Sequence, residues 1–70
     1  MNLQYLKENR QLKNLTQKQL AEKIGIKYGT YRQVEIGLKN VSLKTFAKLV
    51  QVLELDANKL LSIEEHHTSA

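Results

Sequence analysis

The stretch Thr16–Gly37, TQKQLAEKIGIKYGTYRQVEIG, predicts two short helices joined by a tight turn. Thr16 is a good N-cap because its hydroxyl can accept from free backbone N–H groups, and Gln19 three residues later completes a capping box. A helix should therefore start at Gln17, and Gly25 supplies the positive φ that ends it. Three apolar residues at helical spacing form the inner face of this helix: Leu20, Ala21 and Ile24.

The second helix of this stretch follows the turn and stops near Gly37. Tyr31 and Val34 lie three residues apart, so both can face the same core as Ile26. The other positions point outward, and they are Tyr28, Gly29, Arg32 and Gln33. A short helix with a buried seam and an outer face of this kind suits the major groove of double-stranded DNA.

The basic residues are concentrated in the part of the chain that carries these two helices. Residues 1–48 hold ten Lys or Arg against three acids, a net charge of +7, whereas residues 49–70 hold one Lys against four acids, a net charge of −3. A phosphate backbone is the commonest partner of such a field. A solvated basic surface without a ligand explains the charge equally well when it is taken alone.

Three further helices complete the predicted fold. A first helix spans Leu3–Lys13, with Leu3 and Leu6 on one face, and Asn14 ends it in a left-handed conformation. Ser42 caps a fourth, largely buried helix, and Asp56 caps a short fifth helix. The apolar stripe of the fourth helix consists of Leu43, Phe46, Ala47, Val50 and Leu53, widened by Leu49 and Val52.

The prediction is thus an all-α, compact five-helix domain over residues 1–62, followed by a flexible C-terminal tail over residues 63–70. The 70 residues include no Cys, so neither a disulfide nor a Cys-based zinc site can stabilise the domain. His66 and His67 are adjacent in the tail, and no metal site is expected there. We expect no cofactor.

The composition also argues against membrane and enzyme classes. No apolar run approaches the roughly 20 residues of a membrane span, so we expect a cytoplasmic protein without a membrane partner. The sequence contains no Gly-rich phosphate loop and no nucleophile with a plausible base. We therefore expect no catalytic residues and no enzymatic activity.

From about Leu3 to Leu61 the sequence resembles the repressor/Cro-type helix-turn-helix family of phage and bacterial regulators. The resemblance is carried by the run LTQKQLAEKIGI, the helix ending in VEIG and the segment VSLKTFAKLVQVLELDANKLL. Its most specific parts are the Leu-Thr-Gln opening, Leu20-Ala21, Gly25 and the Glu35-x-Gly37 close, all in register. The second and third helices would then form the helix-turn-helix, with the third as recognition helix.

The resemblance implies roles for three polar residues. In related domains an Arg at the position of Arg10 pairs with a Glu at the position of Glu35, which would hold the first helix to the third; the alternative is two ordinary surface charges. Gln17, at the start of the second helix, would bind a phosphate and brace the recognition helix, helped by the helix dipole. Arg10 is a further phosphate candidate if Glu35 does not occupy it.

Several positions depart from the family pattern. Asn9 replaces a more usual aliphatic residue, and Ile36 replaces a more usual polar one. Lys27 stands where a Ser or Thr cap is usual, so the third helix has a weaker cap or starts one residue later. Glu54 stands where Gly usually ends the fourth helix, which leaves that turn open. Gly29 indicates either close approach of the backbone to DNA or a relaxed position.

Base reading, with DNA as the ligand, falls to Tyr28, Arg32 and Gln33, with Gly29 permitting approach. Gln can pair with adenine and Arg with guanine, while Tyr28 can reach a phosphate or a thymine methyl. The candidate phosphate contacts are Gln17, Lys27, Lys39, Asn40 and Lys44. A solvated lysine explains each Lys alone, but their position on one side of one motif favours phosphate binding. Stacking on single strands is less favoured, because Tyr5 and Tyr31 are expected to pack inside.

The predicted function is a sequence-specific transcriptional regulator, a repressor that binds a palindromic operator as a homodimer with its recognition helices about 34 Å apart. Candidates for the self-contact are Leu55, Ala57, Asn58 and Leu61, with packing inside the domain as the alternative. Two other functions stay open. One is an antitoxin or restriction-modification controller with the same DNA chemistry, modulated by a protein partner. The other is a protein-interaction module that does not read DNA.

Overall fold

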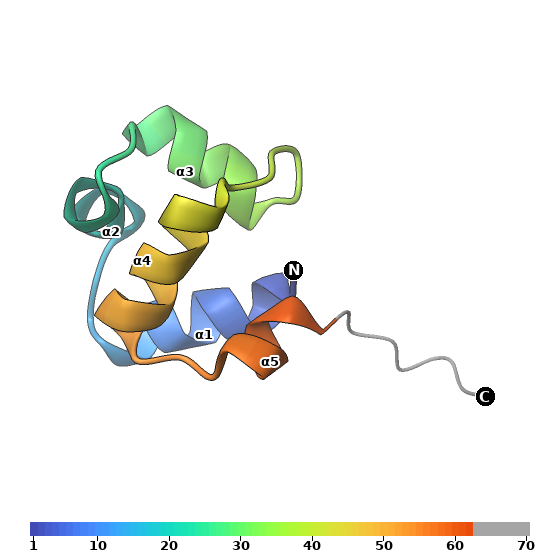
Figure 1. Ribbon diagram of the computed structural model, residues 1–70. Coiled ribbons are helices and arrows are strands. Elements are labelled where there is room, and N and C mark those ends of the chain that lie inside the picture. Colours follow the sequence, from blue (N-terminus) through green and yellow to red (C-terminus); the bar gives the residue numbers. More distant parts are fainter. Residues whose placement is uncertain (63–70) are drawn as a thin grey trace.

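The computed structural model describes residues 1–62, which form five α-helices and no strand (Figure 1). The helices are α1 (Leu3–Leu12), α2 (Gln17–Ile24), α3 (Tyr28–Glu35), α4 (Leu43–Leu53) and α5 (Ala57–Leu61). The all-α class and the five helices confirm the prediction from sequence. The predicted tail, residues 63–70 with His66 and His67, lies outside the described residues. No described helix is long and apolar enough to cross a membrane.

The ends of α1 and α2 follow local sequence signals. The capping box is complete, because Thr16 Oγ1 accepts from the N–H of Gln19 at 3.0 Å and Gln19 Oε1 accepts from the N–H of Thr16 at 2.9 Å. Gly25 ends α2 at φ 79°, as predicted. Asn14 adopts φ 57°, although α1 ends at Leu12, one residue earlier than predicted. The two helices are therefore delimited largely by local chemistry.

The start of α3 lacks a side-chain cap. Lys27 occupies the N-cap position and forms no capping hydrogen bond, so the helix begins at Tyr28 with the weak cap that the sequence indicated. Beyond the other end of α3, Gly37 has φ 87°, and a Cβ there would lie 3.3 Å from Leu3 Cδ1. Gly37 is thus favoured by its backbone conformation, and a larger residue there would also press on the Leu3 side chain.

Glu54 preserves the left-handed turn that Gly usually makes in this position. It ends α4 at φ 56°, ψ 52°, and the following N–H of Leu55 donates to the carbonyl of Val50 at 3.0 Å. A left-handed residue other than Gly costs about 1–2 kcal/mol. The Glu54 carboxylate also lies 3.2 Å from Lys13 Nζ, but this pair is exposed and compensates little.

The core is formed by ten buried apolar residues: Leu6, Leu20, Ala21, Ile24, Tyr31, Val34, Leu49, Leu53, Leu55 and Leu60. The predicted stripe of α4 was wrong at two positions, because Leu43 is 84% exposed and Ala47 is also exposed. The buried ridge instead runs through Leu49 and Leu53, four residues apart. Leu43 is the first residue of α4, beyond the part of the helix that the core covers.

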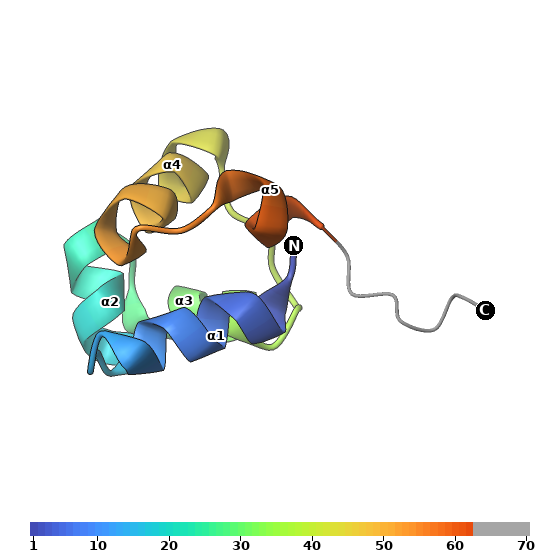
Figure 2. The same cartoon turned by 90° about the horizontal axis from the view of Figure 1, so that it is seen from below.

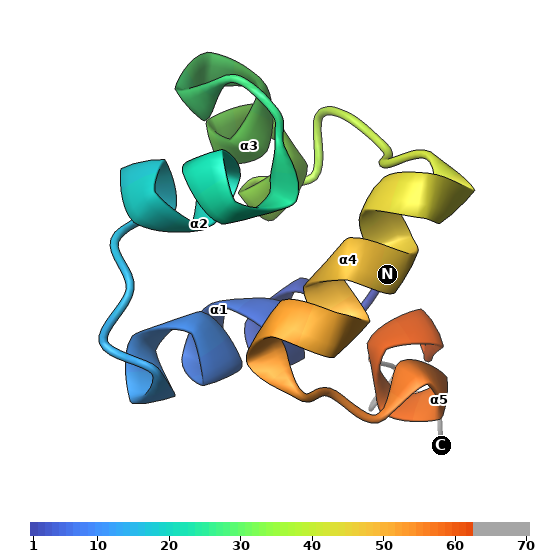
Figure 3. The same cartoon turned by 60° about the vertical axis from the view of Figure 1, so that its left-hand side comes forward.

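The helices are arranged so that α3 and α5 lie at opposite edges (Figures 1 and 3). The N-terminus lies beside α5, where the N–H of Asn2 donates to the carbonyl of Leu60 at 2.7 Å (Figure 2). Tyr5 Oη accepts from the N–H of Asp56 at 2.9 Å and ties α1 to the start of α5. Asn9, the unusual polar residue of α1, donates to the carbonyl of Tyr5. These contacts attach α5 to α1 at one edge of the domain, and α3 lies at the opposite edge.

Candidate nucleic-acid interface

The α3 helix divides sharply into a buried and an exposed face. Tyr31, Val34 and Glu35 are buried, as their spacing requires. The four residues predicted to read bases are all exposed: Tyr28, Gly29, Arg32 and Gln33. The three residues Gly25, Ile26 and Lys27 join α2 to α3, which is the usual connection length in a helix-turn-helix. The structure thus presents one continuous outer face on α3.

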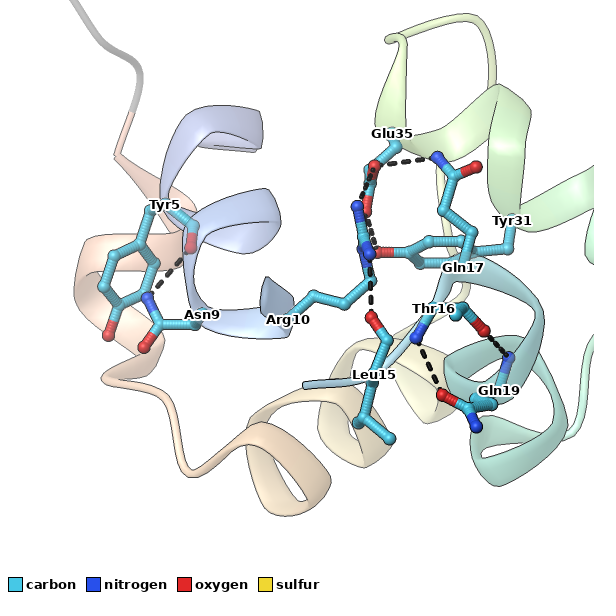
Figure 4. Close-up of polar contacts among 9 residues, drawn as sticks. All are labelled: Tyr5, Asn9, Arg10, Leu15, Thr16, Gln17, Gln19, Tyr31 and Glu35. Atoms are coloured by element: carbon cyan, nitrogen blue, oxygen red, sulfur yellow. Dashed lines mark hydrogen bonds and ion pairs between the residues drawn. The ribbon is translucent and has the colours of Figure 1, made fainter. Parts of the chain in front are cut away.

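Glu35 lies behind this face and accepts hydrogen bonds from three other residues (Figure 4). Arg10 Nε lies 2.6 Å from Glu35 Oε2, and Arg10 Nη2 donates to Oε1 at 3.2 Å. Gln17 Nε2 donates to the same Oε1 at 2.9 Å. The Tyr31 hydroxyl donates to Oε2. A single carboxylate therefore connects α1, the first turn of α2 and α3.

The protonation of this cluster follows from its contacts. Burial acts to raise the pKa of Glu35, but the hydrogen bonds from Arg10, Tyr31 and Gln17 outweigh it and hold the pKa below its usual value. Burial, reinforced by the hydrogen bond to Glu35, raises the pKa of Tyr31. The hydrogen bond with Glu35 raises the pKa of Arg10. At neutral pH the cluster is an ion pair with a neutral tyrosine.

Arg10 is not available to bind a phosphate. Its side chain is nearly buried, and its remaining guanidinium nitrogen Nη1 donates to the carbonyl of Leu15 at 2.8 Å. Together with the two bonds to Glu35, this occupies all three nitrogens of the guanidinium. The alternative of a free Arg10 at the interface is therefore wrong, because Arg10 is buried and each of its nitrogens is bonded within the domain.

Gln17 braces α3 through its bond to Glu35, as the resemblance implied, and its contact with a phosphate stays a prediction. Its amide nitrogen carries two N–H groups, and only one is needed for Glu35. The other candidate phosphate residues are exposed: Lys27, Lys39, Asn40 and Lys44. The sequence reasoning missed the hydroxyl of Tyr31 as a polar partner and treated this residue only as core. The four-residue spacing of Tyr31 and Glu35 on one helix is the signal that was present.

Of the four residues predicted to form the self-contact, three are exposed and one is buried. Leu55 is only 8% exposed and packs in the core of its own domain, so its assignment to a dimer interface is wrong. The turn after Glu54 directs Leu55 inward, and its N–H is bonded to Val50. Ala57, Asn58 and Leu61 are exposed on α5.

A helix-turn-helix whose second helix faces outward and is held from behind by the core is typical of DNA-binding regulatory domains. The chain belongs to the helix-turn-helix family of the Cro/C1 type, whose defining pattern matches residues 6–60. This confirms the resemblance noted in the sequence.

Two curated relatives share this region. The chain is 50% identical over 46 residues to antitoxin HipB of Escherichia coli O6:H1 (strain CFT073). The matched residues cover 66% of this chain and 49% of the relative. The chain is 48% identical over 46 residues to antitoxin HipB of Escherichia coli strain K12, covering 66% and 52% respectively. The chain thus spans about half the length of the curated relatives it matches.

A solved structure, the complex of SinR protein and SinI protein, has a similar fold. It superposes with a TM-score of 0.78 at 30% sequence identity, covering 100% of this chain and 67% of that chain. The five-helix arrangement described above is therefore found in a known structure.

Proposed function

We propose that this domain binds double-stranded DNA at a specific sequence and represses transcription as a homodimer on a palindromic operator. The observation that carries the proposal is the exposed face of α3, with Arg32 and Gln33 outward, supported from behind by the buried Glu35 cluster. Rigid placement of a recognition helix lets side chains meet base edges in a fixed register. Family membership supports the same function.

Phosphate contacts would come from both ends of the motif. The start of α2 offers Gln17 and backbone N–H groups with a favourable dipole. The start of α3 offers Lys27, and the connection to α4 offers Lys39 and Asn40, with Lys44 in the first turn of α4. The net charge of +7 over residues 1–48 would attract this face of the domain to the phosphate backbone of DNA.

Selection of bound sequences from a randomised duplex pool, at two salt concentrations, tests the proposal. A palindrome with half-sites about one helical turn apart is expected, with an affinity that falls steeply as salt increases. Gln33→Ala should relax the base preference at one position of each half-site by about 1–3 kcal/mol. Weak binding without sequence preference would reject the proposal and favour a protein-interaction module that uses this fold.

A second candidate is an antitoxin, which the identity to the two HipB proteins favours. An antitoxin of this kind would keep the DNA chemistry and add a toxin as protein partner. The complex of SinR protein with SinI protein supports a protein partner for a chain that contains this fold. Expression of a candidate toxin, with and without the chain, tests this candidate. Growth arrest that the chain relieves would support it, and unaffected growth would reject it.

A further inference from the structure

Tyr28 and Arg32 form a contact on the exposed face of α3. Arg32 Cζ lies 5.8 Å from the centroid of the Tyr28 ring, within the range of about 6 Å for a cation–π interaction. The two residues are four positions apart on one helix, which places their side chains side by side. The contact therefore lies on the surface that the proposed function directs at DNA.

The edge of the Arg32 guanidinium is unoccupied. Within residues 1–62, Arg32 forms no side-chain hydrogen bond and no salt bridge, in contrast to Arg10, whose three nitrogens are all occupied. A cation–π contact with the ring uses none of the guanidinium N–H donors as hydrogen-bond partners, so they stay free for a ligand. Two of those donors match the O6 and N7 acceptors of a guanine.

The space beside this pair is open. Gly29 is one turn before Arg32, and no atom of the neighbouring structure lies within 4 Å of the position of a Cβ at residue 29. Gly29 does not have the positive φ found at Gly25 and Gly37. Neither its backbone conformation nor its packing requires glycine, and the missing side chain leaves the surface of the helix open at this position.

We propose that Tyr28 is a positioning residue that holds Arg32 in place to read a guanine of the operator. This inference rests on the proposed function and assigns Tyr28 a role through Arg32 in place of a base contact of its own. A guanidinium confined by the ring has less side-chain freedom to lose when it binds a base. The phenol hydroxyl has no part in this role.

The experiment compares three single variants and one double variant by selection from a randomised duplex pool and by affinity for the selected site. Arg32→Ala first identifies the guanine position that depends on Arg32. Tyr28→Phe retains the aromatic ring, and Tyr28→Leu retains an apolar side chain without the ring. Because Tyr28 is 46% exposed at the start of α3, both substitutions should leave the fold intact, which circular dichroism verifies.

The guanine preference at that position should fall about two- to five-fold in Tyr28→Leu, the range of an exposed cation–π contact, and stay unchanged in Tyr28→Phe. In the Arg32→Ala background, Tyr28→Leu should have no further effect at this position. The inference is overturned if Tyr28→Leu retains the guanine preference or if Tyr28→Phe loses it equally. It is overturned too if Tyr28→Leu lowers the preference further in the Arg32→Ala background. It is also overturned if no selected guanine depends on Arg32.

Nuclear magnetic resonance of the free protein separates this inference from the proposed function. Ring stacking should shift the Arg32 side-chain protons upfield in the wild type and in Tyr28→Phe, and the shift should disappear in Tyr28→Leu. If the shift is present but the wild type selects no sequence, the proposed function fails, and guanine reading fails with it. If the wild type selects a palindrome but the shift is absent, the positioning role alone fails.

Discussion

Glu35 shows how much of this domain depends on one residue. Its carboxylate accepts from Arg10, Gln17 and Tyr31, so removing it leaves several buried donors without a partner. A buried ion pair contributes little net stability compared with well-packed apolar residues, but breaking it costs about 3–5 kcal/mol because the remaining charge is uncompensated. The cluster is better understood as a device that fixes the position of α3 relative to α1 and α2.

The lowered pKa of Glu35 predicts an acid-sensitive stability. A carboxyl with a folded pKa below its unfolded value, about 4.3, stabilises the fold above that value. This stabilisation is lost as the pH falls through the folded pKa. Urea unfolding between pH 7 and pH 3 should therefore show a loss of unfolding free energy below about pH 4 that is absent in Glu35→Gln.

Glu22→Gln is the matched control, because Glu22 is exposed on α2, and it should change stability at pH 7 by less than about 0.5 kcal/mol. If Glu35→Gln does not fold, the double variant Arg10→Met with Glu35→Met provides the second measurement. It should fold and lack the acid-sensitive loss attributed to Glu35, because it removes both buried charges together. An acid response identical to that of the wild type would contradict the assignment.

At the scale of the elements, α3 is weakly supported at its N-terminal end and strongly supported in its second half. Lys27 makes no cap hydrogen bond, and Gly29 in the first turn lowers helix propensity. Tyr31, Val34 and Glu35 instead attach the second half to the core. The residues proposed to read bases thus extend from a helix that tertiary contacts stabilise.

Gly29→Ala distinguishes the two explanations of this glycine. No neighbouring atom obstructs a Cβ at residue 29, so the substitution should raise the free energy of unfolding by about 0.5–1 kcal/mol through helix propensity. Thermal unfolding measures this effect. Affinity for the selected duplex gives the second result. A loss of affinity despite greater stability would show that DNA needs the open backbone, and unchanged affinity would show a relaxed position.

At the scale of the whole molecule, α3 and α5 occupy opposite edges (Figure 3). The hydrogen bonds from Asn2 to Leu60 and from Asp56 to Tyr5 attach α5 to α1. The proposed self-contact through Ala57, Asn58 and Leu61 therefore does not compete with the proposed DNA face for the same surface.

Leu61→Glu tests the proposed dimer. Leu61 is 60% exposed, and burying such a side chain in an interface stabilises by about 1.5 kcal/mol or more, so its replacement should weaken self-association at least about tenfold. Sedimentation of the free protein and titration of the palindromic duplex both report the change. Leu12→Glu, at a 77% exposed leucine on α1, is the control and should leave both unchanged. A dimer that persists in Leu61→Glu would exclude this part of α5 from the interface.

The sequence by itself determined where the five helices lie and most of their ends, because caps, glycines and apolar periodicity act within a few residues. Thr16 with Gln19, Gly25, Ser42 and Asp56 all behave as their chemistry predicts. The exposed face of α3 followed from the same periodicity.

Only the tertiary structure decided which residues meet across the chain. It showed that Arg10 bonds to both Glu35 and the carbonyl of Leu15, that Leu55 points inward and that Leu43 does not. Each of these depends on which element lies opposite a given side chain, and helical spacing in one segment carries no information about its neighbour.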